Sequence, residues 1–190
     1  MEKKGLDVSS WKGRVILGLL LFVTHYVVLY VYMAVHELLG HALATLLIGG
    51  KVYGIILPLL GTRGFNASLF LLIQQEGVSW RSLTWVFAAG PIAGMIFGFL
   101  MLFLVLPKLK SFLPRLLVFV MGSWACLIDS FYIFSAFFPL VYPASIWWIG
   151  DAAWIGYFSD ISLEVLAVVG SILFFVFATC AYKRFFHVFK

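Results

Sequence analysis

The sequence predicts an all-α polytopic membrane protein, and three observations support this fold class. Of the 190 residues, 64% are hydrophobic and 11% are charged, whereas an ordinary soluble domain has roughly 25% charged residues. Four apolar runs are long enough to cross a bilayer as helices. The basic residues flank these runs instead of forming a folded basic face, so the net charge of +5 indicates an anionic lipid surface and no nucleic acid.

Charge, glycine or proline bounds each of the predicted spans, which cover residues 15–48, 83–106, 116–138 and 161–182. The first is too long to cross the bilayer at a right angle, because a helix rises about 1.5 Å per residue, so we expect it to tilt or bend before Gly49 and Gly50 end it. No internal repeat or flexible linker divides the chain. We therefore expect one integral membrane domain over residues 1–190, with about four transmembrane helices.

Residues 51–76 have a different pattern, in which short apolar pieces alternate with glycine and proline. This pattern is typical of strands or of a re-entrant segment. Unpaired strand backbone cannot face lipid, so we expect this strand-like segment to lie at the membrane surface or against the helices.

The basic residues also predict an orientation. Ten of the 13 Lys and Arg residues precede the first span, join the second to the third, or follow the fourth. Positively charged connections stay on the cytoplasmic side. We expect both termini to be cytoplasmic, in a cell membrane.

His36, Glu37 and His41 lie in the first apolar run, where an uncompensated ionisable group costs a few kcal/mol. Two histidines five positions apart point about 140° away from each other on a regular α-helix. Gly40 offers a remedy, because a π-bulge or local unwinding beside glycine brings both rings to one side. The pattern therefore predicts a distorted helical turn that gathers these side chains.

Two motifs, HELLGHALATLLIGG and FAAGPIAGMIFG, resemble the zinc intramembrane metalloproteases of the site-2 protease type over roughly residues 30 to 155. Those enzymes pair an HExxH helix with a downstream Ala-Gly-Pro helix and a later Asp. The additional residue in HELLGH is similar to the HExxGH zinc motif of the dipeptidyl peptidase III family. The resemblance implies that His36 and His41 bind Zn²⁺ and that Glu37 is the general base.

The resemblance also implies a third protein ligand, with the fourth position left for water. Asp151 follows the third span and lies in a loop on the same side of the membrane as His36 and His41, so we expect it to be the ligand. Asp129, in the middle of the third span, is the reserve.

The function expected from these residues is a zinc-dependent intramembrane endopeptidase that cleaves a membrane-spanning protein or peptide within or beside the bilayer. One alternative is a non-catalytic membrane binding or assembly subunit that retains this architecture. Another is a structural Glu37–His41 pair in which His36 binds a backbone carbonyl. His25 is expected to be a hydrogen-bonded bundle residue instead of a ligand. The substrate and the oligomeric state stay open.

Overall fold

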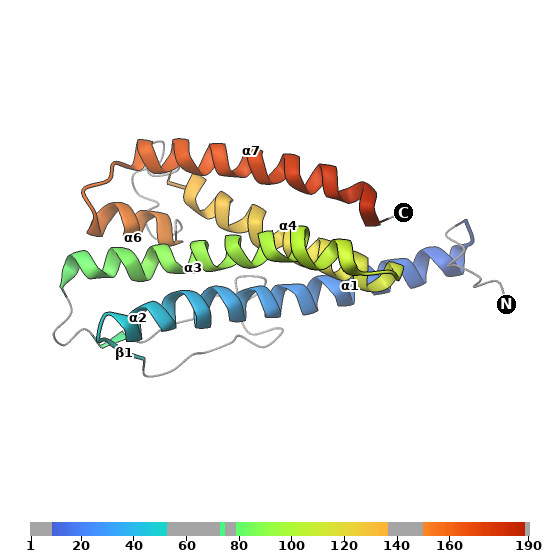
Figure 1. Ribbon diagram of the computed structural model, residues 1–190, viewed down its shortest axis with the longest axis horizontal. Coiled ribbons are helices and arrows are strands. Elements are labelled where there is room, and N and C mark those ends of the chain that lie inside the picture. The colour runs from blue at the N-terminus through green and yellow to red at the C-terminus, as the bar shows by residue number, and fades with distance from the viewer. Residues whose placement is uncertain (1–8, 53–72, 75–78, 137–149, 189–190) are drawn as a thin grey trace.

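The protein is an all-α polytopic membrane protein, as the sequence predicts. The computed structural model describes residues 9–52, 73–74, 79–136 and 150–188 (Figure 1). Four helices in this part of the chain are long and apolar enough to span a membrane: Trp11–Leu47, Arg81–Lys108, Phe112–Phe134 and Leu163–Phe186. The predicted spans agree with these bounds to within a few residues.

The first span is one continuous helical rod with a distorted turn near its end. It consists of α1 (Trp11–Ala34), a π-helical segment η1 (Val35–Ala42) and α2 (Leu43–Leu47). Ser10 caps its start, because its hydroxyl accepts a 3.0 Å hydrogen bond from the Gly13 N–H. Its end is set by Gly49, whose φ of 84° suits glycine. The structure confirms both the predicted distortion and the predicted stop.

Two short strands follow the first span. β1 (Lys51–Val52) pairs antiparallel with β2 (Ile73–Gln74). The strand-like prediction is thus confirmed where the segment begins and at residues 73–74. Residues 53–72 and 75–76, which the prediction also covered, lie outside the described residues.

The second span, at the centre of the bundle, contacts η1, α4 and α6 (Figure 1). It begins as α3 (Trp80–Leu100) and ends in a π-helical turn η2 (Met101–Val105) and a 3-10 turn η3 (Leu106–Lys108). The remaining helices are α4 (Phe112–Phe134), the short α6 (Gly150–Phe158) and α7 (Leu163–Val188). α4 and α7 pack along each other, and α6 packs on α3 near the start of that helix.

Glycines spaced one turn apart let α3 approach its neighbours closely. A methyl group on Gly98 would lie 2.5 Å from the Cys126 sulfur and 2.6 Å from the Gly122 carbonyl oxygen of α4. Gly94 and Gly90, further back along α3, face α4 and η1 in the same way. Apolar burial gives helices little drive to associate in lipid, so small residues that allow close backbone contact hold the bundle together.

One end of the bundle is strongly basic. The start of α1, the turn between α3 and α4, and the end of α7 lie together at this end (Figure 1). They carry Lys12, Arg14, Lys108, Lys110, Arg115, Lys183 and Arg184. Among the described residues, no acidic side chain lies there, since Glu37, Asp129, Asp151, Asp160 and Glu164 all lie towards the other end.

Candidate metal centre

The π-helical turn brings His36 and His41 together. Their ring centroids are 4.8 Å apart, and their Nε2 atoms are 3.2 Å apart. A regular helix would separate the two side chains by about 140°, whereas the wider π-helical turn places residues five apart above one another. Both rings are buried. The extra residue in HELLGH is therefore compatible with one shared site.

Each imidazole is oriented through its other nitrogen. The Nδ1–H of His41 donates to the carbonyl oxygen of Val86 on α3, at 2.6 Å. A carbonyl can only accept, so this nitrogen carries the proton and Nε2 presents a lone pair in the neutral ring. The Nδ1–H of His36 donates to Asp129 Oδ1 at 2.8 Å, which fixes the same tautomer in the second ring. Both Nε2 lone pairs thus face a common point.

Asp151 adds a carboxylate from the first turn of α6. Its Oδ2 lies 3.2 Å from His36 Nε2, and its Oδ1 lies 3.4 Å from His41 Nε2. Burial alone would raise the pKa of this carboxyl, but its interactions with His41 and His36 outweigh burial and hold the pKa below its usual range. Asp151 is therefore ionised, the form that binds a cation.

With both rings in these tautomers, two lone pairs and one carboxylate face the centre of the cluster, which therefore suits a cation. A tetrahedral metal ion with bonds of about 2.1 Å holds its ligands about 3.4 Å apart. The two Nε2 atoms are 3.2 Å apart. His36 Nε2 lies 3.2 Å from one Asp151 oxygen and His41 Nε2 lies 3.4 Å from the other, and one ligand atom from each of the three residues lies within 4.8 Å of the other two. His36, His41 and Asp151 can therefore hold a metal ion, with a fourth position left over for water or substrate.

Two glycines, Gly40 on η1 and Gly90 on α3, supply the space for this arrangement. A methyl group on Gly40 would lie 2.5 Å from the Gly90 Cα, so η1 and α3 touch backbone to backbone. A methyl group on Gly90 would lie 2.7 Å from His36 Nε2 and would also collide with His41 Nε2. The two glycines thus keep the space beside the converging nitrogens free of side chains.

Glu37 follows His36 directly on the π-helical turn. It is half-buried, and among the described residues its carboxylate forms no hydrogen bond or ion pair. The predicted Glu37–His41 pair of the structural alternative is therefore not seen in this part of the chain. The carboxylate is left available beside the cluster.

Asp129, the reserve ligand, lies on the opposite side of the His36 ring from the cluster. It is fully buried, and its Oδ1 also accepts a 2.6 Å hydrogen bond from the Tyr32 hydroxyl. Its Oδ2 has no partner among the described residues and lies against Gly94, where a methyl group would collide with it. Asp129 thus orients His36 instead of joining His36, His41 and Asp151.

Two of these contacts, those of Tyr32 and of the Val86 carbonyl, were not predicted from the sequence. Tyr32 precedes His36 by one helical turn, and this i, i+4 spacing of a hydroxyl and an imidazole is a signal that could have revealed it. The Val86 carbonyl has no sequence signal, because any residue type supplies it. His25 lies outside the cluster, and its ring packs edge-on against Trp124 at 4.7 Å.

Comparisons with protein-family models, curated proteins and solved structures found nothing that matches this chain.

Replacing Gly90 with alanine should abolish metal binding. The added methyl group would push His36 Nε2 and His41 Nε2 apart. Removing a residue that only orients a metal ligand lowers metal affinity by about 10- to 100-fold, and we expect a larger loss of metal affinity here. Metal content by mass spectrometry would measure the loss, and circular dichroism would report the fold. Gly18→Ala is the matched control, because nothing lies within 4 Å of that position. Full metal content in the Gly90→Ala protein would contradict the geometry.

Asp129→Asn should weaken metal binding by about 10- to 100-fold, because an amide is a poorer acceptor for the His36 Nδ1–H. Tyr32→Phe removes one hydrogen bond to the same carboxylate, so its loss should be smaller. Competition with a chelator of known affinity measures both effects. Asp160→Asn, in an exposed pair with Arg81, is the control. Equal affinities in Asp129→Asn and the control would show that Asp129 has no part in orienting His36.

Proposed function

We propose that this chain is a zinc-dependent endopeptidase that hydrolyses a peptide bond within or beside the bilayer. One observation carries the proposal: the Nε2 atoms of His36 and His41 converge with the Asp151 carboxylate. Glu37, whose carboxylate is unpaired among the described residues, directly follows His36. Two imidazoles and one carboxylate suit zinc, whereas calcium and magnesium prefer oxygen ligands throughout. Three protein ligands with an open position are typical of catalytic zinc sites.

The residues divide the chemistry in a definite way. When bound, zinc supplies a Lewis acid that polarises the scissile carbonyl and lowers the pKa of water. The Glu37 carboxylate takes one proton from the attacking water, whose oxygen forms the new bond to the carbonyl carbon. As the C–N bond breaks, Glu37 delivers that proton to the departing amine. Asp129 and Val86 keep both imidazoles in the tautomer that leaves Nε2 free.

The site lies far from the basic end of the bundle. At about 1.5 Å per residue, His36 is about 33 Å along the first helix from Arg14, and the hydrocarbon layer is about 30 Å thick. The centre is therefore near the opposite boundary of the hydrocarbon layer. Suitable substrates are membrane-spanning proteins or peptides whose peptide bonds become exposed by local unwinding near that boundary.

Glu37→Gln should abolish cleavage, because an amide cannot take the proton from water. The protein should keep its metal, because residue 37 does not belong to the ligand group. We expect a loss of at least about 100-fold, the lower range for general acid–base catalysis. The assay incubates purified protein in detergent with a panel of transmembrane peptides and detects products by mass spectrometry. Glu164→Gln, an exposed carboxylate on α7, is the matched control.

The outcomes separate this function from its rivals. Wild-type protein without stoichiometric zinc would overturn the proposal. Stoichiometric zinc with equal activity in wild type and Glu37→Gln would remove the assigned base, and zinc with no cleavage in the wild type would favour a non-catalytic binding or assembly subunit.

We also infer that the basic end of the bundle faces the cytoplasm in a cell membrane, which would place the metal centre towards the other face. The inference is supported by the gathering of cationic residues at one end of the described structure. A fluorescent protein fused after Lys190 should fluoresce, and alkaline phosphatase at the same position should be inactive. Active phosphatase with no fluorescence would reverse the orientation.

A further inference from the structure

Tyr132 lies beside the candidate metal centre, although it is neither one of the ligands nor the base assigned above. It follows Asp129 by three residues on α4, so the two side chains leave the same side of the helix. Its ring centroid is 6.1 Å from that of His36, with an angle of 55° between the ring planes. Tyr132 and Asp129 therefore approach the same imidazole from one helix.

Packing at the end of α4 brings Tyr132 near Asp151 as well. Ala136, one turn after Tyr132, belongs to the same buried apolar cluster as Ala152, the residue that follows Asp151. Among the charged groups of the described residues, the Asp151 carboxylate acts most strongly on the Tyr132 hydroxyl, and the Glu37 carboxylate acts on it too. The hydroxyl therefore lies near the carboxylate that completes the ligand group.

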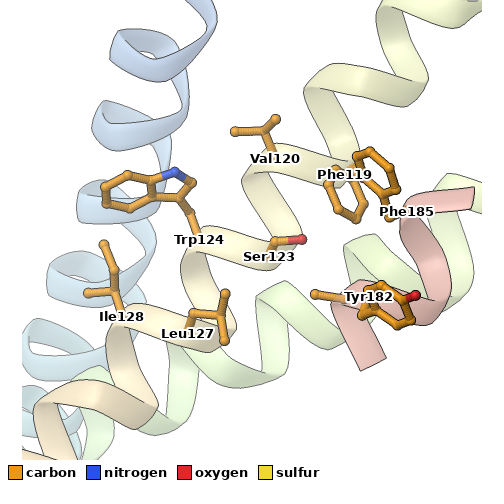
Figure 2. A pocket seen from close by; sticks show the side chains of 9 residues that line it. Phe119, Val120, Ser123, Trp124, Leu127, Ile128, Tyr182 and Phe185 are labelled. Atoms are coloured by element: carbon orange, nitrogen blue, oxygen red, sulfur yellow. The ribbon is translucent and has the colours of Figure 1, made fainter. Parts of the chain in front are cut away.

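Tyr132 lies where the buried cluster meets its surroundings. Its side chain is 39% exposed, whereas that of His36 is 5% exposed. The apolar groove on α4 and α7 is a separate feature, since the α4 residues that line it lie between Phe119 and Ile128 and Tyr132 is one turn beyond them (Figure 2). Tyr132 thus borders the metal centre on a side from which a substrate can approach.

The Tyr132 hydroxyl has no hydrogen-bond partner among the described residues. In contrast, the polar hydrogens of Tyr32 and of both imidazoles are already donated to Asp129 and to the Val86 carbonyl. A tyrosine hydroxyl is protonated at neutral pH and can donate one hydrogen bond. Tyr132 therefore offers a donor beside the cluster that the folded chain does not use.

Peptide hydrolysis at this site requires such a donor. When water attacks the scissile carbonyl, negative charge develops on the carbonyl oxygen, close to the carboxylates of Glu37 and Asp151. A preorganised donor aimed at that oxygen stabilises the transition state. Arg81, the cationic residue of α3, is exposed and lies 3.8 Å from the carboxylate of Asp160. An uncharged hydroxyl at the cluster is therefore better placed than this cation to meet the new charge.

We propose that Tyr132 is a catalytic residue whose hydroxyl stabilises the negatively charged oxygen of the tetrahedral intermediate. The assignment rests on the proposed peptidase function. As the water oxygen bonds to the carbonyl carbon, Glu37 takes a proton from it, and the carbonyl oxygen accepts a hydrogen bond from Tyr132, which keeps its own proton. The electron pair on that oxygen then re-forms the double bond as the C–N bond breaks, and Glu37 protonates the departing amine.

Tyr132→Phe tests the assignment, because it removes the hydroxyl and keeps the ring beside His36. We expect kcat for the transmembrane peptides to fall about 100- to 1,000-fold, the loss that follows removal of one oxyanion donor. KM should stay unchanged, because the hydrogen bond strengthens only in the transition state. Metal content and circular dichroism should match the wild type. Tyr182→Phe, which removes a hydroxyl from α7 at the groove, is the matched control.

Inhibitor binding gives a second measurement that does not depend on turnover. A phosphinic peptide carries a tetrahedral anionic centre that resembles the intermediate, whereas its parent peptide carries a planar amide. We expect titration calorimetry on zinc-loaded Glu37→Gln protein, which does not consume the peptide, to show that Tyr132→Phe weakens phosphinic binding at least about tenfold, the loss of one hydrogen bond to a charged group. Binding of the parent peptide should be equal with and without the hydroxyl.

The outcomes separate this assignment from the function on which it rests. If the wild type cleaves and Tyr132→Phe has the same kcat, or if phosphinic affinity is the same with and without the hydroxyl, the assignment is overturned and the peptidase function stands. Loss of metal from Tyr132→Phe would show that Tyr132 only positions His36, which also overturns it. A wild type that neither cleaves peptides nor binds the phosphinic peptide overturns both.

Discussion

The site depends on one local distortion, the π-helical turn from Val35 to Ala42. In a regular helix, His36 and His41 would face different neighbours and each would need its own partner inside the membrane. The wider turn places both on one side, so that one set of compensating groups serves both rings. Helices α3, α4 and α6 supply these groups as the Val86 carbonyl, Asp129 and Asp151. The convergence of three helices on one turn follows from that local geometry.

Close approach of α3 is the second requirement, and it links packing to chemistry. Gly90 and Gly94 face the polar side chains directly, so the residues that let α3 pack closely also leave room for His41 and Asp129. In lipid, small residues are what allow helices to make close contact. The Ala-Gly-Pro motif at residues 89–91 therefore serves two purposes at once, the close packing of α3 and the space around the imidazoles. Any side chain larger than hydrogen at Gly90 must displace either the helix or the imidazoles.

Much of this arrangement could be read from the sequence, because its causes are local. The four spans follow from composition and length, and the distortion at Gly40 follows from the five-residue histidine spacing. The choice between Asp151 and Asp129 depended on which helix faces reach His36 in three dimensions, and the sequence could only rank them. The contact of His41 with the Val86 carbonyl was beyond prediction, because every residue type supplies such a carbonyl.

Charge balance favours a metal ion over protons at the centre of the cluster. Asp129 and Asp151 bring two negative charges to the histidines, and two protonated imidazoles would neutralise them. Those imidazoles, however, would place two positive charges at Nε2 atoms only 3.2 Å apart. With an effective dielectric constant of about 20, like charges at this distance repel by about 5 kcal/mol. One divalent cation neutralises the same carboxylates without this repulsion and satisfies both lone pairs at once. A buried charge in a bilayer must be paired to be tolerated, and one divalent ion pairs both carboxylates while the two Nδ1–H groups keep donating to Val86 and Asp129.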